Sequence, residues 1–353
     1  MKHIAAITDA LDSKGIDAIL VTDNRNIRYL TGFSGSFGCL IITKKERVFC
    51  TDSRYAEQVR KQITGCEVMI ISDEKPKALI EKAKALGVKT LGFESTITYA
   101  FYKSLLRKGV RLKAVSNFVE DLRKIKDSAE VKLIEKAVER AEQAFFEVKP
   151  YIKKDVSERK IAAMLEESIR KRGCSGLPFD IIVAAGQNSA MPHARPTDNK
   201  IKAGDLVLID WGGEAGGYFS DMTRTFLVKG ENISKKQEIY KTVLLANRAA
   251  INFVAESKQA KMVDRTARDI IKNAGYDDFF GHGTGHGVGI DIHELPHISK
   301  TGNESIKAGM VFTVEPGIYI PGLGGVRIED MIAVEKGRCR VLTTIPKELE
   351  IIN

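Results

Sequence analysis

The sequence lacks the features that would place it in a membrane or hold it together with disulfides. No apolar run reaches the roughly 20 residues needed to span a bilayer. The first residues, MKHIAAITDALDSKG, contain no apolar signal region. The five cysteines are odd in number, scattered, and form no CxxC pair. These absences predict a cytoplasmic protein with reduced thiols and no membrane partner.

Excess charge of one sign is also modest. The chain has 55 Lys and Arg residues against 46 Asp and Glu residues, a formal net charge of +9. Its lysines are spread along predicted helices and do not form a dense block interleaved with aromatic residues. We therefore expect a solvated, lysine-rich surface and no nucleic-acid partner.

The length of the chain predicts two domains. Its 353 residues exceed the usual size of a single domain. We place the boundary near Lys124 to Lys126, which gives domains of residues 1–125 and 126–353. The first alternates helical and strand patterns, which predicts a small α/β domain. The second combines long helices with hairpins, which predicts an α+β domain.

The predicted helices of the second domain begin with the same spacing of two polar residues. In a capping box, a polar residue before the helix is followed three residues later by Glu or Gln. We predict three such boxes: Asp127 with Glu130, Asp155 with Glu158, and Ser234 with Gln237. Apolar residues at helical spacing follow each of them.

A hairpin is predicted over Val207–Thr225, VLIDWGGEAGGYFSDMTRT. An apolar strand ends at Asp210, a connection with four glycines follows, and the chain returns to Asp221. Neighbouring strands would bring these two carboxylates close together. Two adjacent buried carboxylates repel each other unless positive charge lies between them.

Histidine is concentrated in one segment, GHGTGHGVGIDIHELPH, residues 281–297. It contains four of the six histidines of the chain: His282, His286, His293 and His297. The last five residues match the zinc-protease pattern HExxH, which requires a helix. We reject that alternative because Pro296 would break the helix. The cluster still indicates a functional site.

Two glutamates occur in apolar strands of the same domain. Glu315 ends the strand in VFTVEPG, and Glu329 lies inside a predicted strand, GGVRIEDMIAV. A buried carboxylate needs a partner. For either residue alone, a salt bridge to Arg327 or Arg224 is the simple alternative.

Taken together, these residues form a set with metal-binding chemistry. The set has four carboxylates and one imidazole: Asp210, Asp221, His286, Glu315 and Glu329. Oxygen-rich ligands with one nitrogen suit Mn²⁺, Co²⁺, Fe²⁺ or Zn²⁺. Two such ions would offset four negative charges and could clamp a hydroxide nucleophile between them.

The order of these motifs resembles a known family. DWGG…SDMTRT, GHGTGHGVG, VEPGIY and VRIED are similar to the metallopeptidases that include methionine aminopeptidase, prolidase and aminopeptidase P. The resemblance implies a pita-bread catalytic domain preceded by a creatinase-like N-terminal domain. The segments NIRYLTGFSGS and TDSRYAEQ look most like bacterial Xaa-Pro aminopeptidases, which implies a homodimer.

By this resemblance, the ligands divide between two divalent ions. Asp210 would bind one ion, and His286 and Glu315 the other. Asp221 and Glu329 would bridge them. Mn²⁺ is the preferred ion, with Co²⁺, Zn²⁺ or Fe²⁺ as alternatives.

The resemblance also implies roles around the metals. His193 and His293 would stabilise the reacting substrate oxygen, and Glu315 would act as general base. Arg327 would orient a ligand carboxylate. Three residues are expected near the substrate: His282, His297 and Tyr218.

The expected function is an Xaa-Pro aminopeptidase that uses a metal-bridging hydroxide. It would remove the first residue from peptides with proline at the second position. The alternative is an Xaa-Pro dipeptidase, or prolidase, restricted to dipeptides. A third hypothesis is a non-enzymatic binding protein that uses the same pocket; the five intact ligand positions argue against it.

Overall fold

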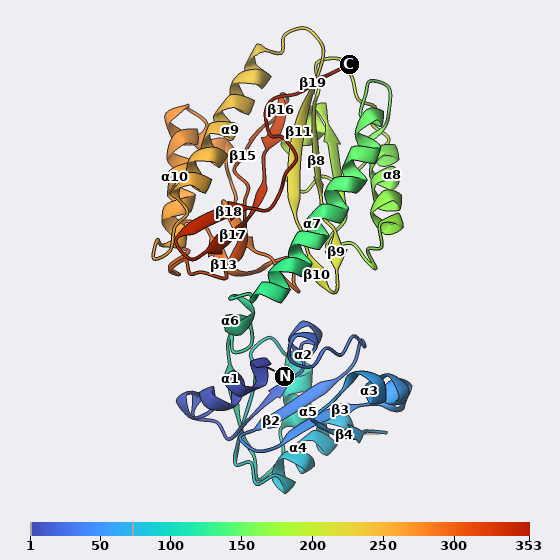
Figure 1. The fold of residues 1–353 in the computed structure, drawn as a ribbon, viewed down its shortest axis with the longest axis vertical. Coiled ribbons are helices and arrows are strands. Elements are labelled where there is room, and N and C mark those ends of the chain that lie inside the picture. Colours follow the sequence, from blue (N-terminus) through green and yellow to red (C-terminus); the bar gives the residue numbers. More distant parts are fainter. Residues whose placement is uncertain (1, 73) are drawn as a thin grey trace. The chain divides into compact units, whose positions relative to one another are not determined.

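The computed structural model describes residues 2–72 and 74–353 and divides into two compact units, Met1–Arg123 and Lys124–Asn353 (Figure 1). Each unit has its own sheets and its own core. Among the described residues, no helix combines the length and the apolar character needed to cross a membrane.

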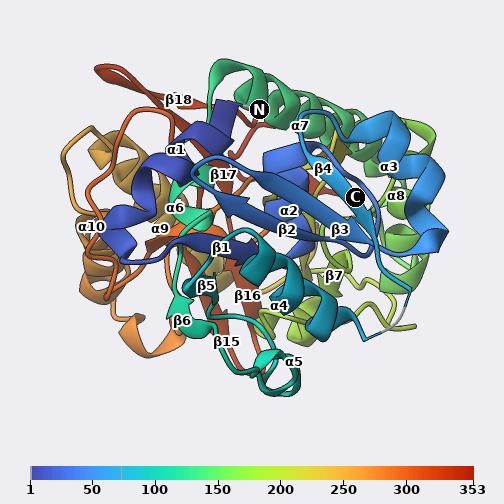
Figure 2. The same cartoon turned by 90° about the horizontal axis from the view of Figure 1, so that it is seen from below.

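The first unit is built on one mixed sheet of six strands in the order β4-β3-β2-β1-β5-β6 (Figure 2). Its strands are β1 (Ala18–Val21), β2 (Cys39–Thr43), β3 (Arg47–Thr51), β4 (Glu67–Ile70), β5 (Thr90–Glu94) and β6 (Arg111–Val115). Its helices are α1 (Lys2–Ala10), α2 (Asn24–Thr31), α3 (Ala56–Gln62), α4 (Lys75–Ala85), α5 (Tyr99–Leu105) and α6 (Glu120–Arg123). Apolar residues of α4 and α5 pack with those of β1, β2, β3 and β5. The predicted α/β character is confirmed.

The second unit contains four long helices around several sheets. The helices are α7 (Ser128–Val148), α8 (Glu158–Lys171), α9 (Ser234–Phe253) and α10 (Ala260–Asn273). In Figure 1, α7 and α8 lie on one side of the strands, and α9 and α10 lie on the other. The core here is formed mainly by the apolar faces of α9 and α10 against strands of the C-terminal half.

Two larger sheets carry the chemistry-bearing segments. One has the order β19-β11-β8-β7, and the other has the order β13-β12-β14-β17-β18. The first contains β7 (Ile182–Ala185), β8 (Leu206–Trp211), β11 (Met222–Val228) and β19 (Ile351–Ile352). The second contains β12 (Gly285–Gly287), β13 (Glu294–Ile298), β14 (Val311–Val314), β17 (Asp330–Glu335) and β18 (Arg338–Val341). Two short ribbons complete the unit: β9 (Glu214–Ala215) with β10 (Tyr218–Phe219), and β15 (Gly317–Ile320) with β16 (Gly324–Arg327).

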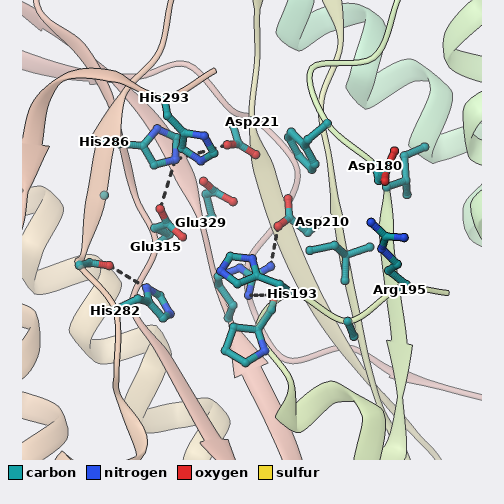
Figure 3. Close-up of a pocket in the computed structure, with 18 of the residues that line it drawn as sticks. Asp180, His193, Arg195, Asp210, Asp221, His282, His286, His293, Glu315 and Glu329 are labelled. Atoms are coloured by element: carbon teal, nitrogen blue, oxygen red, sulfur yellow. Dashed lines mark hydrogen bonds and ion pairs between the residues drawn. The ribbon is translucent and has the colours of Figure 1, made fainter. Parts of the chain in front are cut away.

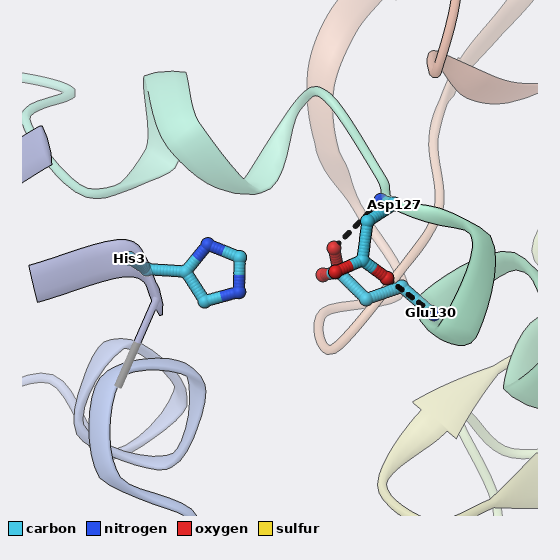
Figure 4. Close-up of side chains that lie close together, drawn as sticks. All are labelled: His3, Asp127 and Glu130. Carbon is cyan, nitrogen blue, oxygen red and sulfur yellow. Dashed lines mark hydrogen bonds between the residues drawn. The ribbon is translucent and has the colours of Figure 1, made fainter.

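Only the first predicted capping box forms. Figure 4 shows Asp127 and Glu130 at the start of α7, where the side chain of each accepts a hydrogen bond from the backbone N–H of the other, at 3.0 and 2.8 Å. The prediction for Asp155 is wrong, because its φ of 66° places it outside the cap and Ser157 caps α8 instead. The prediction for Ser234 is also wrong, since it is already helical and no side chain caps α9.

The HELPH segment is extended, as its proline requires. Glu294–Ile298 forms strand β13 and pairs with β12. A helix that would place two histidines on one face is absent from this described segment, so the rejection of the zinc-protease pattern is confirmed.

The single tryptophan of the chain joins α7 to the hairpin strand β8. Trp211 is fully buried, and its ring stacks on Phe145 with centroids 4.5 Å apart. Its indole N–H donates to the carbonyl of Ala141 at 3.0 Å. This contact fixes the strand that ends beside Asp210 against the longest helix of the unit.

We expect Trp211→Phe to lower the free energy of unfolding by about 1–3 kcal/mol, because it removes the buried hydrogen bond from the indole N–H to the Ala141 carbonyl and creates a small cavity. Urea unfolding followed by circular dichroism measures the loss. The control is Phe146→Leu on the same helix, a side chain that is half exposed and should change stability by less than about 0.5 kcal/mol. Equal losses in both variants would contradict the prediction.

Candidate metal centre and active site

The predicted hairpin is formed by β8 and β11, which pair antiparallel with Asp210 opposite Thr223. The glycine-rich segment folds into the small ribbon β9–β10, which turns at Gly216 and Gly217 with φ of 57° and 86°. These left-handed angles require glycine. Asp210 is the penultimate residue of β8, and Asp221 directly precedes β11, so both carboxylates lie at the same end of the hairpin.

The structure brings the five predicted ligands to one cavity of about 470 Å³ (Figure 3). They reach it from two sheets and the turns beside them. Its lining includes Asp210, Asp221, His286, Glu315 and Glu329. The predicted residues His193, His282, His293 and Arg327 also line it.

The glycines around His286 allow the strands to approach closely. A Cβ atom on Gly285 would lie 1.9 Å from the Thr313 carbonyl oxygen, and one on Gly287 would lie 2.1 Å from that of Leu295. No larger residue fits either position without moving backbone. The backbone N–H of His286 donates to the Thr313 hydroxyl at 3.1 Å, which fixes where the imidazole enters the cavity.

The hydrogen bonds of His286 leave one ring nitrogen available as a ligand. Nδ1 lies 3.1 Å from the carbonyl oxygen of Gly287, which can only accept, so Nδ1 carries the proton. Nε2 then presents its lone pair to the cavity, 3.5 Å from Asp221 Oδ2 and 3.4 Å from Glu315 Oε1. Burial lowers the pKa of His286, which favours the neutral, ligating form.

The carboxylates are too close together to be ionised without compensation. Burial, followed by repulsion from the neighbouring acids, raises the pKa of Asp221 and of Glu329 well above the ordinary range. Burial also raises the pKa of Glu315. Arg327 donates to Asp210 Oδ2 at 2.5 Å, and a single guanidinium cannot offset four carboxylates. The cavity therefore needs protons or cations.

The salt-bridge alternative for the two glutamates is not what the structure shows. Arg327 pairs with Asp210, and Arg224 pairs with Asp330 at 2.9 Å. Glu329 accepts instead from the Thr223 hydroxyl at 2.7 Å. Among the described residues, no lysine or arginine forms an ion pair with Glu315 or Glu329.

The donor atoms fit a divalent ion. Asp221, His286 and Glu329 offer ligand atoms that all lie within 4.8 Å of one another. Asp210 Oδ1 and Asp221 Oδ1 are buried and have no hydrogen-bond partner within the described ranges. Such orphaned oxygens are costly unless a cation binds them.

Two supporting side chains were not found by sequence reasoning. The Thr223 hydroxyl accepts from Arg327 Nε at 3.0 Å while it donates to Glu329. The Tyr319 hydroxyl accepts from Arg327 Nη1 at 2.8 Å and donates to His282 Nε2 at 2.9 Å. Thr223 could have been found from strand alternation, which places residues two apart in β11 on the same face.

Two predicted substrate residues do not line the cavity. Tyr218 is buried and its hydroxyl donates to Glu130 at 2.8 Å, so the expectation that it lines the pocket is corrected. His297 pairs with His286 across β12 and β13 but is exposed and is not among the lining residues. His286 and His297 are therefore paired across the two strands, but only His286 lines the cavity.

Comparison with known proteins identifies the family. The model of metallopeptidase family M24 matches residues 132–336, and that of the creatinase/prolidase N-terminal domain matches residues 3–125. The chain belongs to metallopeptidase family M24. This confirms the expected pita-bread fold with a creatinase-like N-terminal domain. Membership implies divalent metal ions and makes the chain a metallo-exopeptidase.

Relatives are similar over almost their whole length. The chain is 38% identical to a Pyrococcus horikoshii protein named Xaa-Pro dipeptidase, covering 99% of this chain and 98% of the relative. A solved Xaa-Pro dipeptidase from Bacillus anthracis is 40% identical, with a TM-score of 0.96 and coverage of 100% and 99%. A solved X-Pro aminopeptidase from Thermotoga maritima is 33% identical, with a TM-score of 0.87 and coverage of 96% and 98%.

Because protons compensate the acids when no metal is bound, metal-free protein should lose stability as pH rises. Unfolded Asp and Glu titrate near about pH 4, whereas Asp221 and Glu329 keep their protons to higher pH in the folded state. Above about pH 4 the folded state therefore binds more protons than the unfolded state, and rising pH favours unfolding. We expect a lower Tm at about pH 8 than at about pH 5.5, and recovery on adding Mn²⁺.

The matched control is the double variant Asp221→Asn, Glu329→Gln, whose amides have no proton to lose. Its metal-free Tm should depend less on pH, and added Mn²⁺ should raise it less. If the metal-free wild type and the double variant show the same pH dependence, these two carboxyl groups are not the source of the effect.

Proposed function

We propose that the protein is a metal-dependent Xaa-Pro dipeptidase that hydrolyses dipeptides with proline in the second position. The observation that carries the proposal is the acidic five-ligand cavity in a chain that matches named Xaa-Pro dipeptidases from end to end. The similarity to these dipeptidases favours this alternative over the Xaa-Pro aminopeptidase first expected from the sequence. Aminopeptidase activity remains the second candidate because of the Thermotoga relative.

We propose that the cavity holds two divalent ions, with Mn²⁺ preferred because the ligands are mostly carboxylate oxygens. Asp210 would hold one ion, and His286 and Glu315 would hold the other. Asp221 and Glu329 would be shared between them, in keeping with the burial and the neighbouring acids that raise the pKa of both groups. Arg327 holds the Asp210 carboxylate in place.

When bound, the ions supply Lewis-acid activation of water and of the scissile carbonyl. The protein supplies the proton transfers and the positioning. Glu315 is the proposed general base. Burial lowers the pKa of His293, so at neutral pH its imidazole is uncharged and can donate one hydrogen bond to the reacting oxygen. His193, exposed within the cavity wall, is placed to make a second such contact.

The distribution of charge in the cavity suits a zwitterionic dipeptide. The part of the cavity that holds the predicted metal ligands is acidic. Arg195 lines another part of the cavity wall, away from those ligands (Figure 3). Arg195 is exposed and forms no hydrogen bond or ion pair within the described residues. We propose that it binds the free carboxylate of the dipeptide. A longer peptide would present a neutral amide there and lose a charge-assisted hydrogen bond.

We further propose a homodimer located in the cytoplasm. The cytoplasmic location is supported by the five cysteines, all of which are free in the structure. The dimer is proposed from the resemblance of the N-terminal motifs to the dimeric enzymes of this group.

Asp221→Ala should abolish hydrolysis of Ala-Pro, with a loss of more than about a hundredfold in kcat/KM, because a shared ligand is removed. The bound metal per chain, measured by elemental analysis, should fall in parallel. Asp269→Ala, at an exposed residue of α10, is the control and should keep both. Unchanged turnover by the metal-loaded Asp221 variant would contradict the two-ion site.

Ala-Pro and Ala-Pro-Ala separate the two candidate activities. A dipeptidase should cleave only Ala-Pro, and Arg195→Gln should raise its KM for Ala-Pro by about tenfold or more through loss of a charged hydrogen-bond donor. Arg170→Gln, at an exposed residue of α8, is the matched control. Comparable cleavage of Ala-Pro-Ala by the wild type would establish the aminopeptidase instead.

A further inference from the structure

The loop between β7 and β8 forms one wall of the cavity. It begins with a 3₁₀ turn at Gly186–Ala190 and continues without regular structure to residue 199. Its residues 192–196 line the cavity and include His193 and Arg195. We call residues 186–199 the substrate loop.

The exposed part of the substrate loop has few attachments of its own. The side chains of His193 and Arg195 have no hydrogen-bond partner within the described residues. Arg327 reaches the carbonyl oxygen of Pro192 at 3.3 Å, and the N–H of Ala194 bonds within the loop to Met191. The Gly325 N–H also donates to the Ser189 hydroxyl at 2.9 Å. Besides these contacts, the position of both side chains depends on how the two ends of the loop are fixed.

One carboxylate fixes both ends. Glu158, the first residue of α8, accepts at Oε1 from the backbone N–H of Ala185 at 2.8 Å, where β7 ends. At Oε2 it accepts from the backbone N–H and the hydroxyl of Thr197 at 2.9 and 2.6 Å. The amides of Asn188 and Asn199 add contacts at 3.0 and 3.2 Å. Five donor groups from both ends of the loop thus converge on a single side chain.

The environment of Glu158 suits a carboxylate that is stabilised by hydrogen-bond donors and not by an ion pair. The residue is completely buried, and no lysine or arginine among the described residues pairs with it. It lies in the first turn of α8, where the helix dipole favours negative charge. Charge-assisted hydrogen bonds of this kind are about twice as strong as neutral ones.

We propose that Glu158 is a positioning residue that closes the base of the substrate loop and so sets His193 and Arg195 relative to the metal ligands. It does not touch the cavity: Glu158 is not among the lining residues. It acts through the backbone of the loop. The part of the proposal that concerns kinetics rests on the proposed peptidase function, whereas the part that concerns loop structure does not.

Glu158→Gln is the sharpest test because it keeps the shape and removes only the charge and one acceptor. Every group that faces the carboxylate is a donor, so the amide nitrogen of Gln must face another donor on one side. Either the Ala185 end or the Thr197 end of the loop is then released. Hydrogen exchange read by mass spectrometry should show faster exchange in residues 186–199 and unchanged exchange in β8 and β11.

The control is Glu94→Gln in the first unit. Glu94 is also buried and accepts from four donor groups, on Thr22, Asp23 and Asn26, so the chemical change is the same in a different place. Both variants should lose comparable thermal stability. Only Glu158→Gln should raise KM for Ala-Pro, by about tenfold, since displacement of a binding group by about 1 Å carries a cost of this order or larger.

Metal binding separates a shifted loop from a damaged site. Mn²⁺ affinity, measured by calorimetry, should be the same in Glu158→Gln and wild type, because no metal ligand lies on the substrate loop. Thr197→Val, which removes one hydrogen bond to Glu158, is a milder variant for use if Glu158→Gln does not fold. Thr197→Val should also speed hydrogen exchange in the substrate loop and raise KM, but by less than Glu158→Gln does.

Two results would overturn the proposal. One is unchanged hydrogen exchange in the substrate loop. The other is a change in KM no larger than that of Glu94→Gln, in an enzyme that hydrolyses Ala-Pro. If the wild type hydrolyses no Xaa-Pro peptide, the proposed function fails, and the exchange measurement alone decides the role of Glu158.

Discussion

Four carboxylates face one cavity, but among the described residues only Asp210 pairs with a guanidinium, that of Arg327, and the surrounding structure is arranged around that imbalance. Asp210 and Asp221 are separated from Glu315 and Glu329 by more than ninety residues of sequence. Arg195 also lines the cavity but forms no ion pair with these acids among the described residues. Burial and the neighbouring acids raise the pKa of Asp221 and of Glu329, which favours their protonated forms when no metal is bound. Divalent ions would offset the charge of the acids when bound. The folding free energy given up in burying these acids is recovered on binding the ions.

Close backbone approach is the second constraint, and it follows from the first. Ligands can share ions only if their strands lie within a few ångströms of each other. Glycine at positions 285 and 287 permits this, because any side chain there would meet the backbone of β14 or of β13. Thr223 and Tyr319 then occupy the space around Arg327 and orient the charged groups. The histidine-glycine pattern is thus a packing requirement as well as a chemical one.

The proposed metal ligands and the proposed substrate contacts lie on different parts of the second unit. The ligands lie on hairpins and paired strands, which position side chains firmly. His193 and Arg195 lie on an irregular loop whose two ends meet at the carboxylate of Glu158. In this arrangement, substrate preference can change by alteration of the loop without disturbing the ions. That is consistent with one family fold serving both dipeptidases and aminopeptidases.

The sequence by itself determined the family, the two-part organisation and the candidate ligand set. Acids placed in apolar strands, and histidines set among glycines, are locally unfavourable and therefore informative. The sequence also excluded a helical zinc motif, because Pro296 prevents its own segment from forming a helix. Tertiary structure alone decided which side chains reach the cavity. The Tyr218 hydroxyl donates to Glu130 and does not reach the cavity, and Asp155 and Ser234 do not cap their helices. Likewise, only the tertiary structure shows that Glu158 accepts hydrogen bonds from both ends of the substrate loop. Local patterns report what a residue needs, whereas its partner depends on which segments the fold brings beside it.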